Sequence, residues 1–135
     1  MKYEKICSSK KSIIFDGPLL ISPKIFEDER GYFYESWNKS ILDQNLEEEV
    51  VFVQDNHSAS SIGVLRGLHY QIYPKPQHKL VSCISGEIFD VAVDIRKNSD
   101  TFGEWGSIKL NCSNKKMLWI PIGFAHGFLS LKDNS

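Results

Sequence analysis

The sequence has no long hydrophobic run and almost no excess of charge of either sign. Its 135 residues include 16 lysines and arginines and 17 aspartates and glutamates, which gives a formal net charge of −1. A near-neutral chain offers no electrostatic reason to bind nucleic acid or an anionic membrane. No apolar stretch approaches the ~20 residues of a membrane span. Residues 1–11 also lack the apolar core of a secretory signal.

Cysteine is scarce and unpaired in the sequence. Cys7, Cys83 and Cys112 are widely separated, and none belongs to a C-x-x-C motif. An odd number of cysteines argues against a closed disulfide framework, and two of them lie in apolar segments where cysteine acts as a small hydrophobe. We therefore expect a reducing compartment, the cytoplasm. The length suits one domain over residues 1–135, large enough to bury a core without cross-links.

Helical patterns are also rare. Only residues 40–46 predict a helix, with Asn38 or Ser40 as its N-cap. Short strand-like runs dominate instead, over residues 19–26, 31–37, 50–54, 79–85, 87–96, 107–112, 117–120 and 128–131. Pro18 and Pro23 mark the first run as an edge strand. Many short strands and one short helix predict an all-β sandwich or barrel. Polar residues at the strand ends of such a barrel predict a ligand site in its mouth.

The run over residues 87–96 alternates strictly between two faces of a strand. One face carries Phe89, Val91, Val93 and Ile95, and the other carries Asp90, Asp94 and Arg96. The alternation predicts a strand with one apolar and one charged face.

Four polar segments interrupt this strand-rich pattern, at residues 28–35, 54–57, 66–71 with Lys79, and 121–127. The last two have the spacing of the paired motifs of metal-binding cupin barrels. Only His69 and His126 remain as good ligands, because position 71 is glutamine. Two imidazoles are too few for a stable transition-metal site, and a lysine ammonium repels a cation. The sequence therefore predicts a pocket without a metal.

Histidine, lysine and arginine together indicate a different chemistry. Histidine is a general base near neutral pH, whereas lysine and arginine stabilise a phosphate or a developing enolate. The set suits proton abstraction next to a carbonyl, and a keto sugar nucleotide would use all three groups. Taken singly, each residue has a structural explanation: a hydrogen-bonded histidine at 69, surface charges at Arg66 and Lys79, and a turn at 54–56.

Several motifs together resemble one family. They are DERGYFYESW (28–37), FVQDNHS (52–58), GVLRGLHYQ (63–71), HKLV (78–81), GEIFDVAVDIR (86–96), FGEW (102–105) and WIPIGFAHGF (119–128). In this order they resemble the dTDP-4-dehydrorhamnose 3,5-epimerase family, which catalyses the third step of dTDP-L-rhamnose synthesis. The resemblance runs from about residue 18 to about residue 131. It implies a cupin-like jelly-roll barrel and a homodimer that exchanges an N-terminal strand. It also implies no metal or organic cofactor, and dTDP-4-dehydro-6-deoxy-D-glucose as the substrate.

The resemblance also implies roles for particular residues. His69 would be the base that removes protons from C3 and C5, and Lys79 would stabilise the enolate at O4. The sugar nucleotide would be bound by Arg66 and His126, together with Arg30, Glu35, Gln54, Asp55 and Asn56. The family continues past the position of Ser135 with a tyrosine acid and an aspartate that orients the histidine, so we expect this chain to lack the family's C-terminal region.

Two alternatives to this epimerase remain open. The first is a barrel that binds the nucleotide sugar without full catalysis, and the second is a metal-dependent cupin. The resemblance also leaves open whether C3 alone or both C3 and C5 are inverted.

Overall fold

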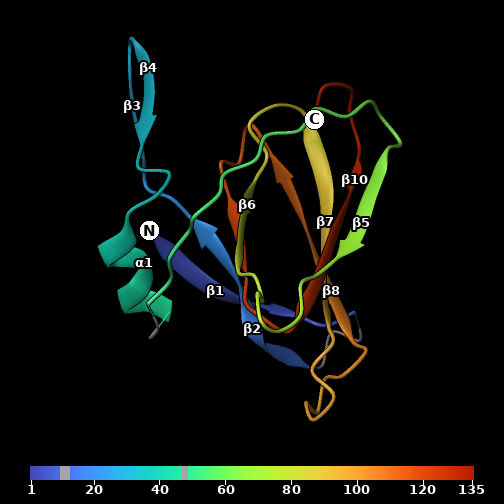
Figure 1. Cartoon of the computed structure of the whole chain (residues 1–135). Helices are drawn as coiled ribbons and strands as arrows, with labels where there is room; N and C mark the ends of the chain where they lie inside the picture. The colour runs from blue at the N-terminus through green and yellow to red at the C-terminus, as the bar shows by residue number, and fades with distance from the viewer. Residues whose placement is uncertain (10–12, 47–48) are drawn as a thin grey trace.

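The computed structural model describes residues 1–9, 13–46 and 49–135. Two four-stranded antiparallel sheets pack face to face (Figure 1). The first sheet has the order β1 (Lys2–Cys7), β2 (Ile14–Ser22), β9 (Met117–Ile120) and β6 (Lys79–Ser82). The second has the order β5 (Leu65–His69), β10 (Phe124–Ser130), β7 (Glu87–Asp94) and β8 (Trp105–Asn111). A hairpin of β3 (Ile25–Asp28) and β4 (Gly31–Tyr34) and the helix α1 (Lys39–Leu46) complete the elements. The predicted all-β fold with one short helix is confirmed.

The space between the two sheets holds the main core. Both sheets contribute to it, with Ile6, Phe15, Leu20, Leu118 and Ile120 from one and Ile88, Ala92, Leu110 and Phe124 from the other. Cys83 is also buried in this core, as its apolar surroundings predicted. The alternation along β7 is confirmed, and its charged face is the inner one, because Asp90 and Asp94 are both fully buried. A buried carboxylate needs a hydrogen-bonding or charged partner.

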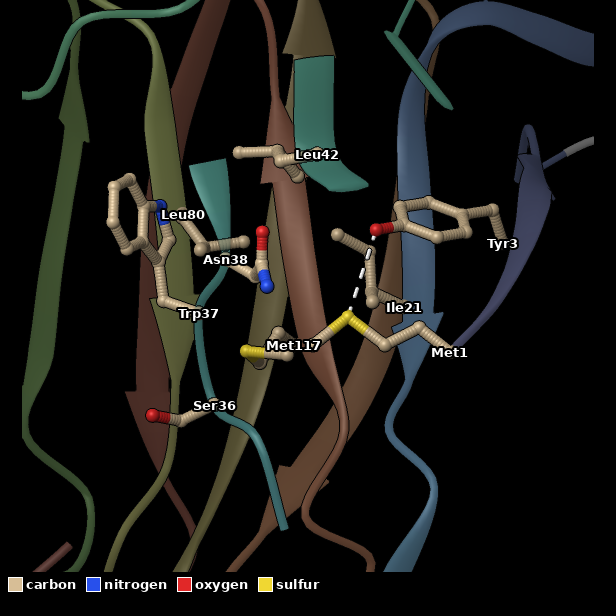
Figure 2. A pocket seen from close by; sticks show the side chains of 9 residues that line it. All are labelled: Met1, Tyr3, Ile21, Ser36, Trp37, Asn38, Leu42, Leu80 and Met117. Atoms are coloured by element: carbon tan, nitrogen blue, oxygen red, sulfur yellow. Dashed lines mark hydrogen bonds between the residues drawn. The ribbon is translucent and has the colours of Figure 1, made fainter. Parts of the chain in front are cut away.

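The helix α1 covers the outer face of the first sheet. Asn38 caps it, since the amide of Ile41 donates to the Asn38 side-chain oxygen at 3.2 Å. Leu42 then packs with Ile21, Val50, Met117 and Trp119 in a second apolar cluster. Figure 2 shows a small cavity at the margin of this cluster. Its lining residues are Met1, Tyr3, Ile21, Ser36, Trp37, Asn38, Leu42, Leu80 and Met117.

Two sequence predictions about strands are wrong. The run over 19–26 is divided between β2 and β3, and β2 is an internal strand between β1 and β9 rather than an edge strand. The β1–β2 pairing shifts register between Lys5 and Cys7, and such an irregularity accommodates the missing amide of Pro18. Residues 50–54 form no strand; Val50 is buried beneath α1 instead, and the partly buried Phe52 packs against Trp119. Within the described ranges, no helix is long and apolar enough to cross a membrane.

Candidate active site

The register of β5 against β10 places three of the candidate side chains on one face of the second sheet, although His69 and Arg66 are exposed in the single chain. Residues directly opposite each other on neighbouring strands share a face of the sheet. His69 lies opposite His126, and His126 lies opposite Ala92, which is fully buried in the core. Arg66 lies opposite Phe128, which packs against the same core. His69, His126 and Arg66 therefore point to the inner face of the second sheet.

Lys79 reaches the same interior from the first sheet. It lies opposite Ile120 on β9, and Ile120 is a core residue. Lys79 is half-buried, and desolvation by burial lowers the pKa of its ammonium group. A poorly solvated ammonium interacts more strongly with a nearby negative charge than one in water does.

His69 and Lys79 lie on the two strands that border one open side of the sandwich. The opposite side is closed where β1 contacts β8, and the amide of Ser9 donates to the Trp105 carbonyl at 2.7 Å. The remaining edges are β5 and β6, which residues 70–78 connect (Figure 1). The topology thus places the candidate base and the candidate cation on the edge strands of opposite sheets, at the same unpaired side of the sandwich, which we call the mouth.

A buried carboxylate contacts His126. Its Nε2 lies 3.0 and 3.1 Å from the two carboxylate oxygens of Asp90. Asp90 is fully buried, and burial raises the pKa of its carboxyl group, although His126 opposes that shift. Asp90 is a residue of this site that the sequence motifs did not predict. The sequence does carry a sign of this contact: an acidic residue in the middle of a buried strand requires a polar or charged partner.

Arg66 is anchored at the rim of the interior. Its Nε donates to the hydroxyl of the buried Ser60 at 3.0 Å, and its Nη2 donates to the carbonyl of Ala59 at 3.4 Å. Ser60 is itself fixed by backbone hydrogen bonds with Ser135 in both directions. These contacts restrain the guanidinium before any ligand binds.

The other predicted residues lie away from this mouth. Arg30 is at the tip of the β3–β4 hairpin, where its Nε donates to Asp28 at 3.1 Å. Glu35 follows β4 and accepts a hydrogen bond from the Asn38 amide at 3.2 Å. The hairpin projects from the sandwich on the side away from β5 (Figure 1). The structure therefore does not bring Arg30 or Glu35 together with His69 in one chain.

The segment over residues 54–56 is exposed and forms no helix or strand. The Gln54 amide donates to the side-chain oxygen of Asn56 at 2.9 Å. Asp55 lies 3.8 Å from the Nε2 atom of His57. These contacts are local, and they join the segment to neither His69 nor Lys79.

Comparison with known proteins identifies the relatives of the chain. The family profile described as dTDP-4-dehydrorhamnose 3,5-epimerase matches residues 12–135. This chain belongs to that family. A dTDP-4-dehydrorhamnose 3,5-epimerase of Shigella flexneri is 57% identical over 117 residues, which cover 87% of this chain and 65% of the relative. The chain thus spans slightly less than two thirds of that relative's length.

Solved structures of epimerases share the fold. An epimerase of Mycobacterium tuberculosis superposes with a TM-score of 0.91 at 40% identity, covering 100% of this chain and 64% of that one. A dTDP-6-deoxy-D-glucose-3,5-epimerase of Legionella pneumophila, in complex with dTDP-4-keto-L-rhamnose, gives a TM-score of 0.86 at 48% identity. That match covers 98% of this chain and 67% of the other. The fold is a cupin-like jelly roll, and the resemblance found in the sequence motifs is confirmed.

Proposed function

We propose that this chain carries the epimerase site of its family and removes a proton next to the keto group of dTDP-4-dehydro-6-deoxy-D-glucose. The observation that supports this most directly is that the register places His69 and Lys79 on the inner faces of opposite sheets. A base and a cation on opposite walls can act on the two ends of one small ketone.

The proposed chemistry begins with neutral His69. Its imidazole takes the proton from C3 or C5, and the electron pair of the broken C–H bond moves to the C4 carbonyl oxygen. Lys79 stabilises the resulting enolate oxygen, and its half-buried position strengthens that interaction. A proton from solvent water added to the opposite face of the carbon completes the inversion, and the imidazolium of His69 returns its own proton to solvent. No step of this sequence calls for a metal or an organic cofactor.

The diphosphate of the substrate needs positive charge at the rim. Arg66 supplies a restrained guanidinium, which suits bidentate contact with phosphate oxygens. His126 lies on the same inner face, and the buried carboxylate of Asp90 holds its Nε2 in place. In this proposal Asp90 is a positioning residue that acts through His126.

We also propose a homodimer in which the hairpin of one copy completes the mouth of the other. Arg30 and Glu35 match the family's nucleotide-binding positions, but Arg30 is at the tip of a hairpin directed away from β5 and Glu35 directly follows that hairpin. A second copy related by two-fold symmetry would bring them to the mouth reciprocally. The exposed segment carrying Gln54, Asp55 and Asn56 is available to the same nucleotide. The three cysteines are free, which supports a cytoplasmic location.

Mixing two inactive variants tests the shared site. We would prepare Arg30→Ala and His69→Asn separately, then mix them under conditions that exchange subunits. Each mixed dimer would hold one intact mouth, with His69 from one copy and Arg30 from the other. Random exchange then restores about a quarter of wild-type turnover. Mixed dimers without recovered turnover would contradict the shared site.

A matched pair of lysine variants tests the chemistry. Lys79→Gln removes the proposed enolate partner, and we expect kcat to fall about 10²- to 10³-fold. Lys75→Gln makes the same change at an exposed position of the loop over residues 70–78 and should leave kcat unchanged. Turnover is measured by the appearance of the epimerised sugar in proton NMR spectra. Binding of dTDP without any turnover by the wild-type chain would instead favour a nucleotide-sugar-binding barrel.

A further inference from the structure

Within the described residues, one side-chain hydrogen bond joins the β3–β4 hairpin to the body of the protein. The Lys115 ammonium donates to the Tyr32 hydroxyl at 2.8 Å, and its nitrogen lies 4.1 Å from the centroid of the Tyr32 ring. No other side-chain hydrogen bond between residues 25–34 and the rest of the described chain is found. The two strands pair only with each other. The direction of the hairpin therefore depends strongly on this contact.

The contact selects one face of the hairpin. Tyr32 and Tyr34 are neighbours on that face, with ring centroids 6.1 Å apart. Phe26 and Phe33 are directly opposite each other on the other face, and they are 52% and 68% exposed. Holding Tyr32 against the body therefore keeps the phenylalanine pair turned outward, beside the tip that carries Arg30.

Lys115 lies on a turn that several side-chain hydrogen bonds to the backbone stabilise. The side-chain oxygen of Asn111 accepts from the amides of Ser113 and Asn114 at 3.0 and 2.7 Å. The side-chain oxygen of Asn114 accepts from the amide of Lys116 at 3.0 Å. Lys115 itself has φ of +53°, a left-handed conformation that is uncommon for a residue with a side chain. These hydrogen bonds hold that conformation and point Lys115 at the hairpin.

We propose that Lys115 is a positioning residue that orients the hairpin, so that Arg30 and the phenylalanine face are presented to the substrate in the mouth of a second copy. The proposal rests on the shared site proposed above. A hydrogen bond to the Tyr32 hydroxyl is the main reason that the pKa of Lys115 is raised, so the contact persists in its charged form throughout the neutral range. Lys115 touches no reacting atom in this scheme, so it should affect substrate binding more than the chemical step.

Trypsin cleavage after Arg30 measures the hairpin without any substrate. Lys115→Gln removes the charge that makes both contacts with Tyr32, and we expect cleavage at Arg30 to become about three- to tenfold faster. Lys116→Gln is the matched control, because it removes the same charge from the neighbouring residue and should leave the rate unchanged. Tyr32→Phe keeps the ring and loses the hydroxyl, and should give an intermediate rate. Equal cleavage rates for wild type and Lys115→Gln would overturn the proposal.

Steady-state kinetics then connect the hairpin to the site. We expect Lys115→Gln to raise KM about three- to tenfold with kcat changed less than twofold, whereas Lys116→Gln changes neither. A fall in kcat with unchanged KM would contradict a positioning role. The two proposals fail separately: a wild-type chain without turnover refutes the proposed function, whereas the cleavage experiment still decides whether Lys115 holds the hairpin.

Discussion

Replacing His126 with phenylalanine tests whether the buried carboxylate of Asp90 needs His126 as its hydrogen-bond partner. The substitution His126→Phe keeps an aromatic ring in a position where the histidine side chain is only 12% exposed. It removes the nitrogen that lies within 3.1 Å of both oxygens of the fully buried Asp90. Asp90 is then left as a buried carboxylate without its donor.

The expected cost follows from that burial. Removing one partner of a buried ion pair costs about 3–5 kcal/mol. The remaining exposure of His126 and protonation of Asp90 reduce this, so we expect a loss of about 2–4 kcal/mol at pH 8. In urea denaturation followed by tryptophan fluorescence, this loss lowers the midpoint by about 1–2 M.

A second substitution separates the charge of Asp90 from the lost packing. Asp90→Asn in the His126→Phe background removes the buried charge, and we expect the double variant to be more stable than His126→Phe by at least about 1 kcal/mol at pH 8. Burial raises the pKa of Asp90, so lowering the pH protonates it in the single variant. The advantage of the double variant should therefore shrink between pH 8 and pH 5. A double variant without any advantage, or with one that does not depend on pH, would refute this reasoning.

Two further predictions concern buried positions in the second sheet. Asp94→Asn should cost about 2–4 kcal/mol, because the buried carboxylate accepts hydrogen bonds from Arg96, Ser99 and Thr101. Those bonds outweigh the effect of burial and lower the pKa of Asp94. The difference in urea midpoint between wild type and Asp94→Asn should thus be constant above about pH 5 and shrink as the pH falls below about 4. A difference that stays constant down to pH 3 would contradict this prediction. Gly106→Ala should cost about 1–3 kcal/mol, because a Cβ atom would lie 2.9 Å from the Cys7 carbonyl oxygen and 2.7 Å from Phe15. An unchanged thermal midpoint for Gly106→Ala would contradict this prediction and show that β1 and β8 can accommodate the added methyl group.

The sequence predicted those elements that are determined by neighbouring residues in the chain. The strand over residues 117–120 has the predicted bounds, and Asn38 caps the helix as its side chain indicated. The alternation along 87–96 gave the two faces of β7 correctly. It could not tell which face is buried, because the partners of Asp90 and Asp94 decide that, and His126 is 36 residues away from Asp90.

Other features depend on tertiary contacts that a single sequence does not reveal. Charged residues at positions 2, 4 and 5 hide the alternation of β1, which is a strand because it pairs with β2. Val50 and Phe52 look like strand residues, but Val50 is buried under α1 and Phe52 packs partly buried against Trp119. The motifs identified Arg30 and His69 as candidates together, whereas the fold separates them. That separation leads to the proposed exchange of hairpins between two copies.

The central claim is that His69 removes the proton next to the keto group. Incubation with dTDP-4-dehydro-6-deoxy-D-glucose in D₂O, followed by proton NMR, tests it directly. Wild-type protein should exchange the proton at C3 or C5 for deuterium, and His69→Asn should reduce that rate about 10²- to 10⁴-fold. Binding of dTDP to His69→Asn, measured by calorimetry, shows that the variant is folded and holds the nucleotide. Exchange by His69→Asn at the wild-type rate would contradict the claim.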